Sequence, residues 1–175
     1  CAQHARVSVA NGQVQVADLD SLNGVWLRIR GEHRLTLGSQ FMVGQQVFVV
    51  GAVGNEDSGR PPMSNDTRRL GASWRSSKLT VSRISSNDRV VARYTVPSDG
   101  LRVGRRQGEI IISDDTYLSG IHAQLSPANS ESLNLRDLST GNGCWVRLNG
   151  TTSLRDGDTF MTGKTSWRVG RALGN

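Results

Sequence analysis

An internal repeat limits how this chain can fold more than any other feature of its sequence. Residues 18–44 align with residues 137–163 without a gap, and twelve of the 27 aligned positions are identical. Ordinary composition would give roughly one or two identities. The spacing of about 119 residues is that of a whole domain rather than of a short solenoid unit. The chain therefore contains two related copies of one fold.

The two copies differ in length at their N-terminal ends. About forty residues of strand-like sequence precede Ser119, whereas nothing precedes the equivalent Cys1. We expect residues 1–50 to be the C-terminal half of a degenerate copy, residues 51–77 a linker, and residues 78–175 a complete copy. The first copy is either a fragment of a longer chain or a half-domain that borrows strands. We favour the fragment, because half a sandwich exposes unpaired strand edges.

The local pattern predicts an all-β fold. Short apolar runs, often alternating with polar residues, are separated by Asn-Gly, Asp-Gly and Pro-Ser-Asp-Gly turn signals. No window keeps a helical period over three turns. The second copy should contain strands at 79–84, 90–96, 101–104, 110–112, 122–125, 133–135, 145–148, 159–161 and 166–169. This number of short strands in under a hundred residues favours a β-sandwich.

Charge and composition narrow the classes of partner. The net charge is +6, with 19 Arg against Lys78 and Lys164, but acidic residues are interleaved with the cations and no basic tail is present. We therefore expect no nucleic-acid binding, which would also need an aromatic stacking surface. The longest apolar run, residues 45–54, is half of a bilayer span and predicts a buried strand. Two cysteines give neither a disulfide framework nor a zinc-ligand spacing, so we expect no metal and a cytoplasmic location.

Three loops of the second copy carry polar residues that the strand pattern does not require. They are Val103–Arg106 at a strand end, Ser119–His122 after an acidic turn, and Thr140–Cys144 before a tryptophan. If one end of the sandwich gathers these loops, a guanidinium group, a hydroxyl and the N–H groups of glycine-rich turns converge. Such a combination is suited to binding phosphate.

The ordered motifs resemble those of the forkhead-associated (FHA) domain. Gly104-Arg105 is followed fourteen residues later by S-x-x-H-A, then by D-L-x-[ST]-x-N-G from Asp137 and by L-x-x-G-D from Leu154. The resemblance covers about residues 78–170 as a complete copy and residues 1–50 as the C-terminal half of another. It implies tandem FHA-like modules, the complete one an eleven-stranded β-sandwich. It further implies binding of phosphothreonine peptides without catalytic activity or a cofactor.

The resemblance also assigns roles to residues of the second copy. Arg105 matches the arginine that pairs with the phosphate, Ser119 the hydroxyl that adds a second contact, and Asn142 the amide that binds the peptide main chain. His122 matches the histidine that braces the loops from beneath. The expected site also includes Arg106, Gly120, Thr140 and Gly141, with Gly104 and Gly143 as structural support.

Some positions depart from the family pattern. Gly120 stands where the family usually has Arg or Lys, and Gly141 where a side-chain contact is common, so we expect a weakened or differently tuned phosphate site. Arg106 either compensates or points to solvent. In the first copy, Cys1 replaces the serine and Leu22 a polar contact, so we interpret this copy as a structural or protein-docking module.

These residues lead to two hypotheses of different classes. The first is a non-catalytic, phosphothreonine-binding adaptor in signalling, whose partners are a phosphoprotein and a serine/threonine kinase. The alternative is a phospho-independent scaffold in which the sandwiches pack together or self-associate within a larger assembly. A catalytic Ser119–His122–Asp114 arrangement is disfavoured, because the sequence has no nucleophile elbow.

Overall fold

A computed structural model describes residues 4–53 and 78–170 of the chain. These residues form sixteen strands and no helix, so none of them forms a helix that could cross a bilayer. The strands of the first copy are β1 (Ala5–Ala10), β2 (Gln13–Asp18), β3 (Val25–Arg28), β4 (Glu32–Thr36), β5 (Gln40–Val43) and β6 (Gln46–Val53). Those of the second copy are β7 (Lys78–Ile84), β8 (Val90–Thr95), β9 (Leu101–Gly104), β10 (Ile110–Ile111), β11 (Ala123–Asn129), β12 (Ser132–Asp137), β13 (Cys144–Arg147), β14 (Thr151–Leu154), β15 (Thr159–Thr162) and β16 (Thr165–Arg168).

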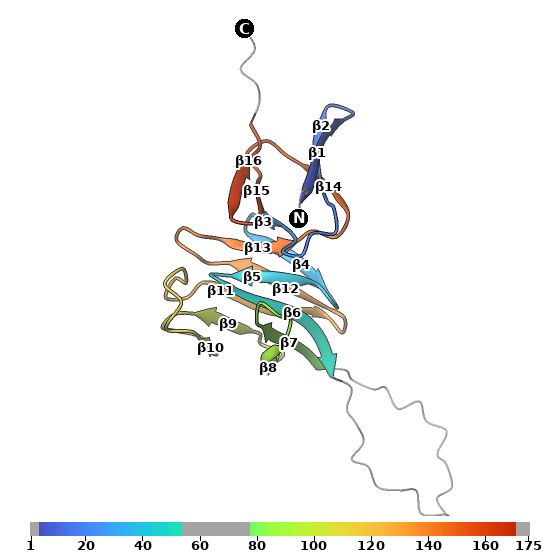
Figure 1. The fold of residues 1–175 in the computed structure, drawn as a ribbon. Coiled ribbons are helices and arrows are strands. Elements are labelled where there is room, and N and C mark those ends of the chain that lie inside the picture. The colour runs from blue at the N-terminus through green and yellow to red at the C-terminus, as the bar shows by residue number, and fades with distance from the viewer. Residues whose placement is uncertain (1–3, 54–77, 171–175) are drawn as a thin grey trace, which may run out of the picture.

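The strands build one large and one small two-layered unit. In the large unit, the sheet β10-β9-β11-β12-β4 packs against β13-β5-β6-β7-β8, which is one end of an eight-stranded sheet. In the small unit, the sheet β1-β2-β14 packs against the other end of the same eight-stranded sheet, β16-β15-β3. Figure 1 shows the small unit above the large one. The all-β sandwich predicted from the sequence is confirmed.

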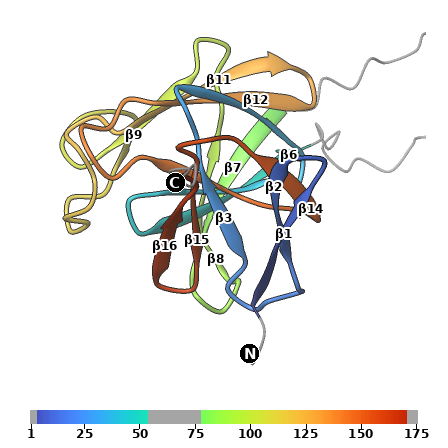
Figure 2. The ribbon, with the colours of Figure 1, turned by 90° about the horizontal axis from the view of Figure 1, so that it is seen from above.

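Each unit contains strands from both copies of the repeat. Strand β4 of the first copy pairs with β12, and its repeat equivalent β14 pairs with β2. Likewise β5 pairs with β13, β15 pairs with β3, and β6 of the first copy lies against β7. Figure 2 shows the result in the small unit, where blue strands from the start of the chain lie beside red strands from its end. The two copies have thus exchanged their last three strands.

The exchange is nearly symmetric about the pair β3–β13. These equivalent strands run antiparallel, with Trp145 opposite Arg28 and Arg147 opposite Trp26. Exchange of identical elements is an inexpensive way to join two copies, because each strand finds an edge like the one it left. Both sheets of the large unit include strands from residues 1–50 and from residues 78–175, so the expected half-domain and the expected complete copy share one sandwich in this structure.

The core of the large unit also combines both copies. Phe41 and Phe48 are fully buried and stack with their ring centroids 5.3 Å apart. They pack with Leu125 of the second copy in one continuous cluster. In the small unit the equivalents of the two phenylalanines are Phe160, which is buried, and Trp167, which is 52% exposed. The position of Phe48 is therefore buried in the large unit, whereas the equivalent Trp167 is exposed in the small unit.

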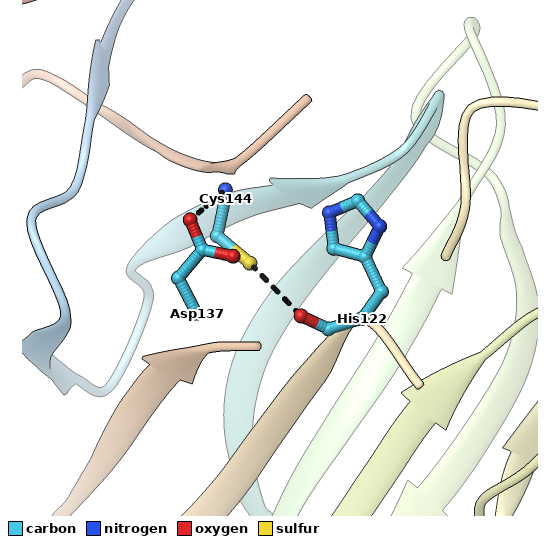
Figure 3. A group of neighbouring side chains, drawn as sticks. All are labelled: His122, Asp137 and Cys144. Atoms are coloured by element: carbon cyan, nitrogen blue, oxygen red, sulfur yellow. Dashed lines mark hydrogen bonds between the residues drawn. The ribbon is translucent and has the colours of Figure 1, made fainter. Parts of the chain in front are cut away.

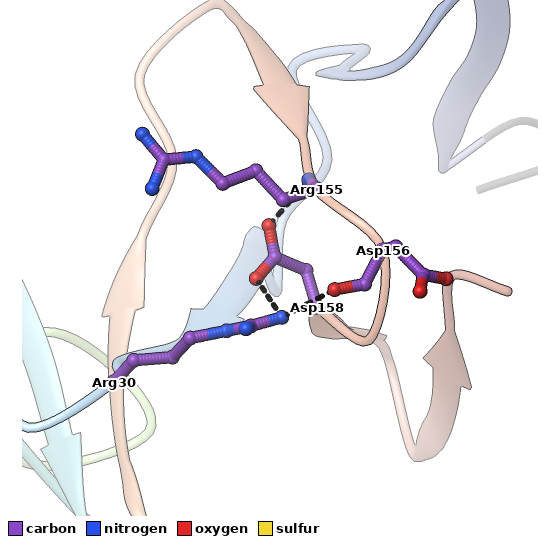
Figure 4. A network of polar contacts seen from close by, with 4 residues as sticks. All are labelled: Arg30, Arg155, Asp156 and Asp158. Carbon is purple, nitrogen blue, oxygen red and sulfur yellow. Dashed lines mark hydrogen bonds and ion pairs between the residues drawn. The ribbon is translucent and has the colours of Figure 1, made fainter.

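Arg30 lies where the first copy crosses from one unit to the other. Its guanidinium group pairs with Asp158 at 2.8 Å and donates a hydrogen bond to the Asp156 carbonyl at 2.7 Å, both in the turn between β14 and β15 (Figure 4). Asp158 also accepts the backbone N–H of Arg155 at 2.6 Å. Because the Arg30 side chain is 59% exposed, this ion pair should contribute little to the free energy of folding. Its main effect is to hold the segment between β3 and β4 against the β14–β15 turn.

Most strands agree with the sequence-based prediction, with two differences of detail. Residues 78–170 contain ten strands rather than the eleven expected, and β14 was not among those predicted. The first three residues of the predicted linker 51–77 belong to β6, where they pair with Lys78–Thr80. The rest of that linker lies outside the described residues.

Candidate functional site

The three predicted loops meet at one surface pocket of the large unit. Its volume is about 420 Å³. The lining residues are Arg105, Thr116, Tyr117, Leu118, Ser119, Gly120, Ile121, Thr140, Gly141 and Asn142. Arg105, Ser119 and Asn142, which the sequence predicted to act together, thus share one pocket, with Thr140, Gly120 and Gly141 between them.

Ser119 is the residue that connects the three loops. Its carbonyl accepts the N–H of Arg105 at 2.9 Å, and its hydroxyl accepts the N–H of Thr140 at 3.2 Å. The Ser119 and Thr140 hydroxyl oxygens are 3.3 Å apart. A phosphate group entering the pocket would therefore meet two neighbouring hydroxyl groups, of which that of Ser119 is held by a backbone N–H group.

The loop that carries Arg105 depends on a close approach of two backbones. The Gly120 carbonyl accepts the N–H groups of Arg106 at 3.2 Å and Gln107 at 3.0 Å. A Cβ atom on Gly104 would overlap the carbonyl oxygens of Gly120 and Gln107, so only glycine fits there. Arg105 lines the pocket and is half-buried, whereas Arg106 is exposed and is not among the lining residues.

Asn142 joins two of the loops. Its side-chain amide donates to the Tyr117 carbonyl at 2.8 Å, and its main-chain carbonyl accepts the indole N–H of Trp145 at 3.1 Å. Trp145 is half-buried, so it supports this turn as well as packing on the sheet. Within residues 4–53 and 78–170 nothing donates to Asn142 Oδ1, which leaves this oxygen able to accept a peptide N–H.

His122 braces the site from beneath, as the sequence predicted. The ring is fully buried, and Nδ1 accepts the Ser119 N–H at 3.1 Å. Nε2 must then carry the proton, which it donates to the Gly143 carbonyl at 3.0 Å. One neutral imidazole therefore ties the serine loop to the Asn-Gly turn.

His122, Asp137 and Cys144 lie together behind the pocket, with one potential ligand atom of each within 4.8 Å of the others (Figure 3). Both ring nitrogens of the histidine already have backbone partners. The Asp137 oxygens accept the N–H groups of Ser139 at 2.9 Å and Cys144 at 3.1 Å. Burial and then the charge of Asp137 raise the pKa of the Cys144 thiol, which disfavours the thiolate that metals bind. The cluster fits a structural brace better than a metal site.

Several residues of the site were not predicted from the sequence. Tyr117 and Leu118 line the pocket, and buried Asp115 holds their loop in place. Asp115 accepts the Tyr117 N–H at 2.9 Å, the Gln45 N–H at 2.8 Å and the Gln46 side-chain amide at 2.9 Å. The last two donors belong to the first copy. No sequence motif indicated this contact, because it exists only through the strand exchange.

The equivalent turn of the first copy keeps its shape without the rest of the site. Trp26 donates its indole N–H to the Asn23 carbonyl at 2.8 Å, as Trp145 does to Asn142. Leu22, which stands at the position of Gly141, is 88% exposed. Cys1, which stands at the position of Ser119, lies outside the described residues.

Comparison with known proteins finds a similarity within the second copy. Residues 101–163 match the family model described as FHA domain. No curated protein and no solved structure matches the chain. FHA domains are non-catalytic interaction modules that generally bind phosphopeptides. The matched segment runs from β9 to β15 and so includes strands that have exchanged into the small unit. The similarity to the FHA domain thus lies within the second copy, while the sandwich that holds the pocket is completed by strands of the first copy.

Proposed function

We propose that the large unit is a phosphothreonine-peptide-binding adaptor module, and that the two copies are tandem FHA-like repeats of which the first is degenerate. The observation that carries the proposal is that Arg105, Ser119 and Asn142 line one pocket. Arg105 supplies a permanent positive charge, Ser119 a hydroxyl donor, and Asn142 an amide that fixes an extended peptide. The natural partners would be a phosphoprotein and the serine/threonine kinase that modifies it, with a cytoplasmic location as the accompanying prediction.

The pocket walls favour phosphothreonine over phosphoserine. Leu118 and Ile121 are among the lining residues and give the pocket apolar surface beside the hydroxyl groups. One buried methyl group contributes about 0.8 kcal/mol, or roughly a fourfold preference. A phosphoserine peptide should therefore bind more weakly than its phosphothreonine equivalent by about that factor.

The test is a titration of a phosphothreonine peptide library and its unphosphorylated counterpart against the full chain. The full chain is required because residues 78–175 alone lack β4, β5 and β6. Arg105→Ala should weaken binding by about 10-fold to 100-fold, the value of one hydrogen bond from a charged group. Arg106→Ala is the matched control, since it removes the same charge one residue away. Equal binding of the two libraries would overturn the proposal.

A phospho-independent scaffold is the second candidate, and the small unit favours it. Strands β1 and β16 are the terminal strands of their sheets, and they expose Val7, Val9 and Trp167. Open strand edges with apolar side chains promote pairing with another copy of the chain. If self-association is the function, sedimentation should show a dimer that Trp167→Ser weakens, and neither peptide library should bind.

A further inference from the structure

The loops of the pocket are held by residues of the first copy, although all its lining residues belong to the second. Arg28 in β3 donates a hydrogen bond from its guanidinium group to the Gly141 carbonyl, within the turn that carries Thr140 and Asn142. Gln45 and Gln46, in and after the β5–β6 turn, hold Asp115 in the loop before Ser119. Two of the three loops thus have a partner some seventy or more residues away in the sequence.

The fit of Arg28 against its turn is close. Gly143 adopts a left-handed backbone with φ +73°, and a Cβ atom there would overlap the Arg28 guanidinium. Gly143 also offers its carbonyl to His122, so the turn is fixed from two sides. With the guanidinium removed, Gly141 would lose its partner and Asn142 would be held by fewer contacts.

The repeat supplies a matched position that lacks the pocket. Arg147 is the equivalent of Arg28, and it donates to the Ser21 carbonyl at 3.1 Å in the corresponding turn of the first copy. A Cβ atom on Gly24 would overlap Arg147, just as one on Gly143 would overlap Arg28. Arg28 and Arg147 therefore contact equivalent turns, and Arg147 donates a further hydrogen bond to the Gln40 side chain at 3.0 Å, but only Arg28 contacts the turn that carries Asn142.

We propose that Arg28 is a positioning residue for the peptide site of the second copy, so that the first copy completes that site within the same chain. Gln46 supports the site in the same way through Asp115. The proposal rests on the proposed phosphopeptide function. It goes beyond that function by assigning a role in binding to a copy that lacks the binding residues itself.

The experiment measures peptide affinity and thermal stability for Arg28→Met and Arg147→Met in the full chain. Arg147→Met should lower the melting temperature at least as much as Arg28→Met, because Arg147 donates hydrogen bonds to both the Gln40 side chain and the Ser21 carbonyl, whereas Arg28 donates one to the Gly141 carbonyl. Arg28→Met should weaken the phosphothreonine peptide about tenfold while Arg147→Met leaves its affinity within twofold of the wild-type chain. Arg28→Lys should restore part of the affinity, since a lysine can still donate to the Gly141 carbonyl.

Gln46→Thr provides a second test of the proposal, which can be carried out even if Arg28→Met does not fold. It introduces the residue that the repeat has at the equivalent Thr165, and it removes the side-chain donor to Asp115. We expect about a threefold loss of peptide affinity. Unchanged affinity in Arg28→Met, or equal loss in Arg28→Met and Arg147→Met, would overturn the positioning role. Absence of phosphate-dependent binding by the wild-type chain would instead refute the proposed function.

Discussion

Substitution of Gly104 by alanine tests whether the close backbone approach beside Arg105 is needed for the fold. A Cβ atom at this position would lie 2.5 Å from the Gln107 carbonyl oxygen and would also overlap the Gly120 carbonyl. Ordinary contacts of a Cβ atom begin at 3.4 Å, so backbone on both sides would have to move by nearly an ångström. Neither neighbour is a flexible side chain that could turn away.

We expect Gly104→Ala to lower the free energy of unfolding by about 3 kcal/mol, the upper part of the range for overpacked sites. For a chain of this size that corresponds to a fall in melting temperature of roughly 6–12 °C. The displaced Gly120 carbonyl accepts the Arg106 and Gln107 N–H groups, so the Arg105 loop should move as well. Peptide affinity should therefore fall together with stability.

Gly120→Ala is the control for this prediction. A Cβ atom on Gly120 has nothing within 4 Å, and Gly120 is not among the glycines with a positive φ. This variant should unfold within about 0.5 kcal/mol of the wild-type chain. Urea and thermal denaturation of the three proteins give the comparison. Equal stability of Gly104→Ala and Gly120→Ala would refute the reasoning from the backbone approach.

Two further predictions concern the exchange and the effect of pH. Asn134 and Arg34 are paired across β12 and β4, so cysteines at these two positions should form a disulfide under mild oxidation. Cysteines at Asn134 and Ser153 should not, because Ser153 pairs with Gln15 of β2. Peptide mapping distinguishes the two disulfides, and the opposite result would indicate unexchanged strands. Partial burial raises the pKa of Asp18, but hydrogen bonds from Ser21 outweigh it and hold that pKa below the ordinary 3.8. Asp18 should therefore stabilise the fold at neutral pH and lose this effect progressively as the pH falls below about 3.8, so urea denaturation should show a smaller stability difference between Asp18→Asn and the wild-type chain at pH 3 than at pH 7.

The sequence was sufficient to predict the strands and the meeting of the three loops. Alternation and turn residues are local signals, so β7, β9 and β13 could be located from their own segments. The pocket could be predicted because the order of its motifs resembles one family. His122 was expected to brace the loops, and its two backbone partners explain why a histidine suits that position.

The exchange could not be predicted in the same way. β4 and β14 are repeat equivalents, and the alternation of apolar residues fits either strand beside β12 equally well. Only long-range packing distinguishes the arrangements, as in the contact of Asp115 with the Gln46 side chain, where the equivalent Thr165 has no amide to offer. Arg28 was visible in the repeat as one of its identities, but its contact with Gly141 lies between the copies.

The exchange also changes what degeneracy of the first copy implies. A copy that has lost its binding residues is free of selection for peptide contacts, yet its Arg28, Gln45 and Gln46 face loops that carry those contacts in the other copy. The reciprocal contact of Arg147 is with the first copy's turn and does not reach the loops that carry Arg105, Ser119 and Asn142. The two proposals together divide binding and support between two copies of one fold, and they predict that a substitution in the first copy alters peptide affinity in the second without touching the peptide.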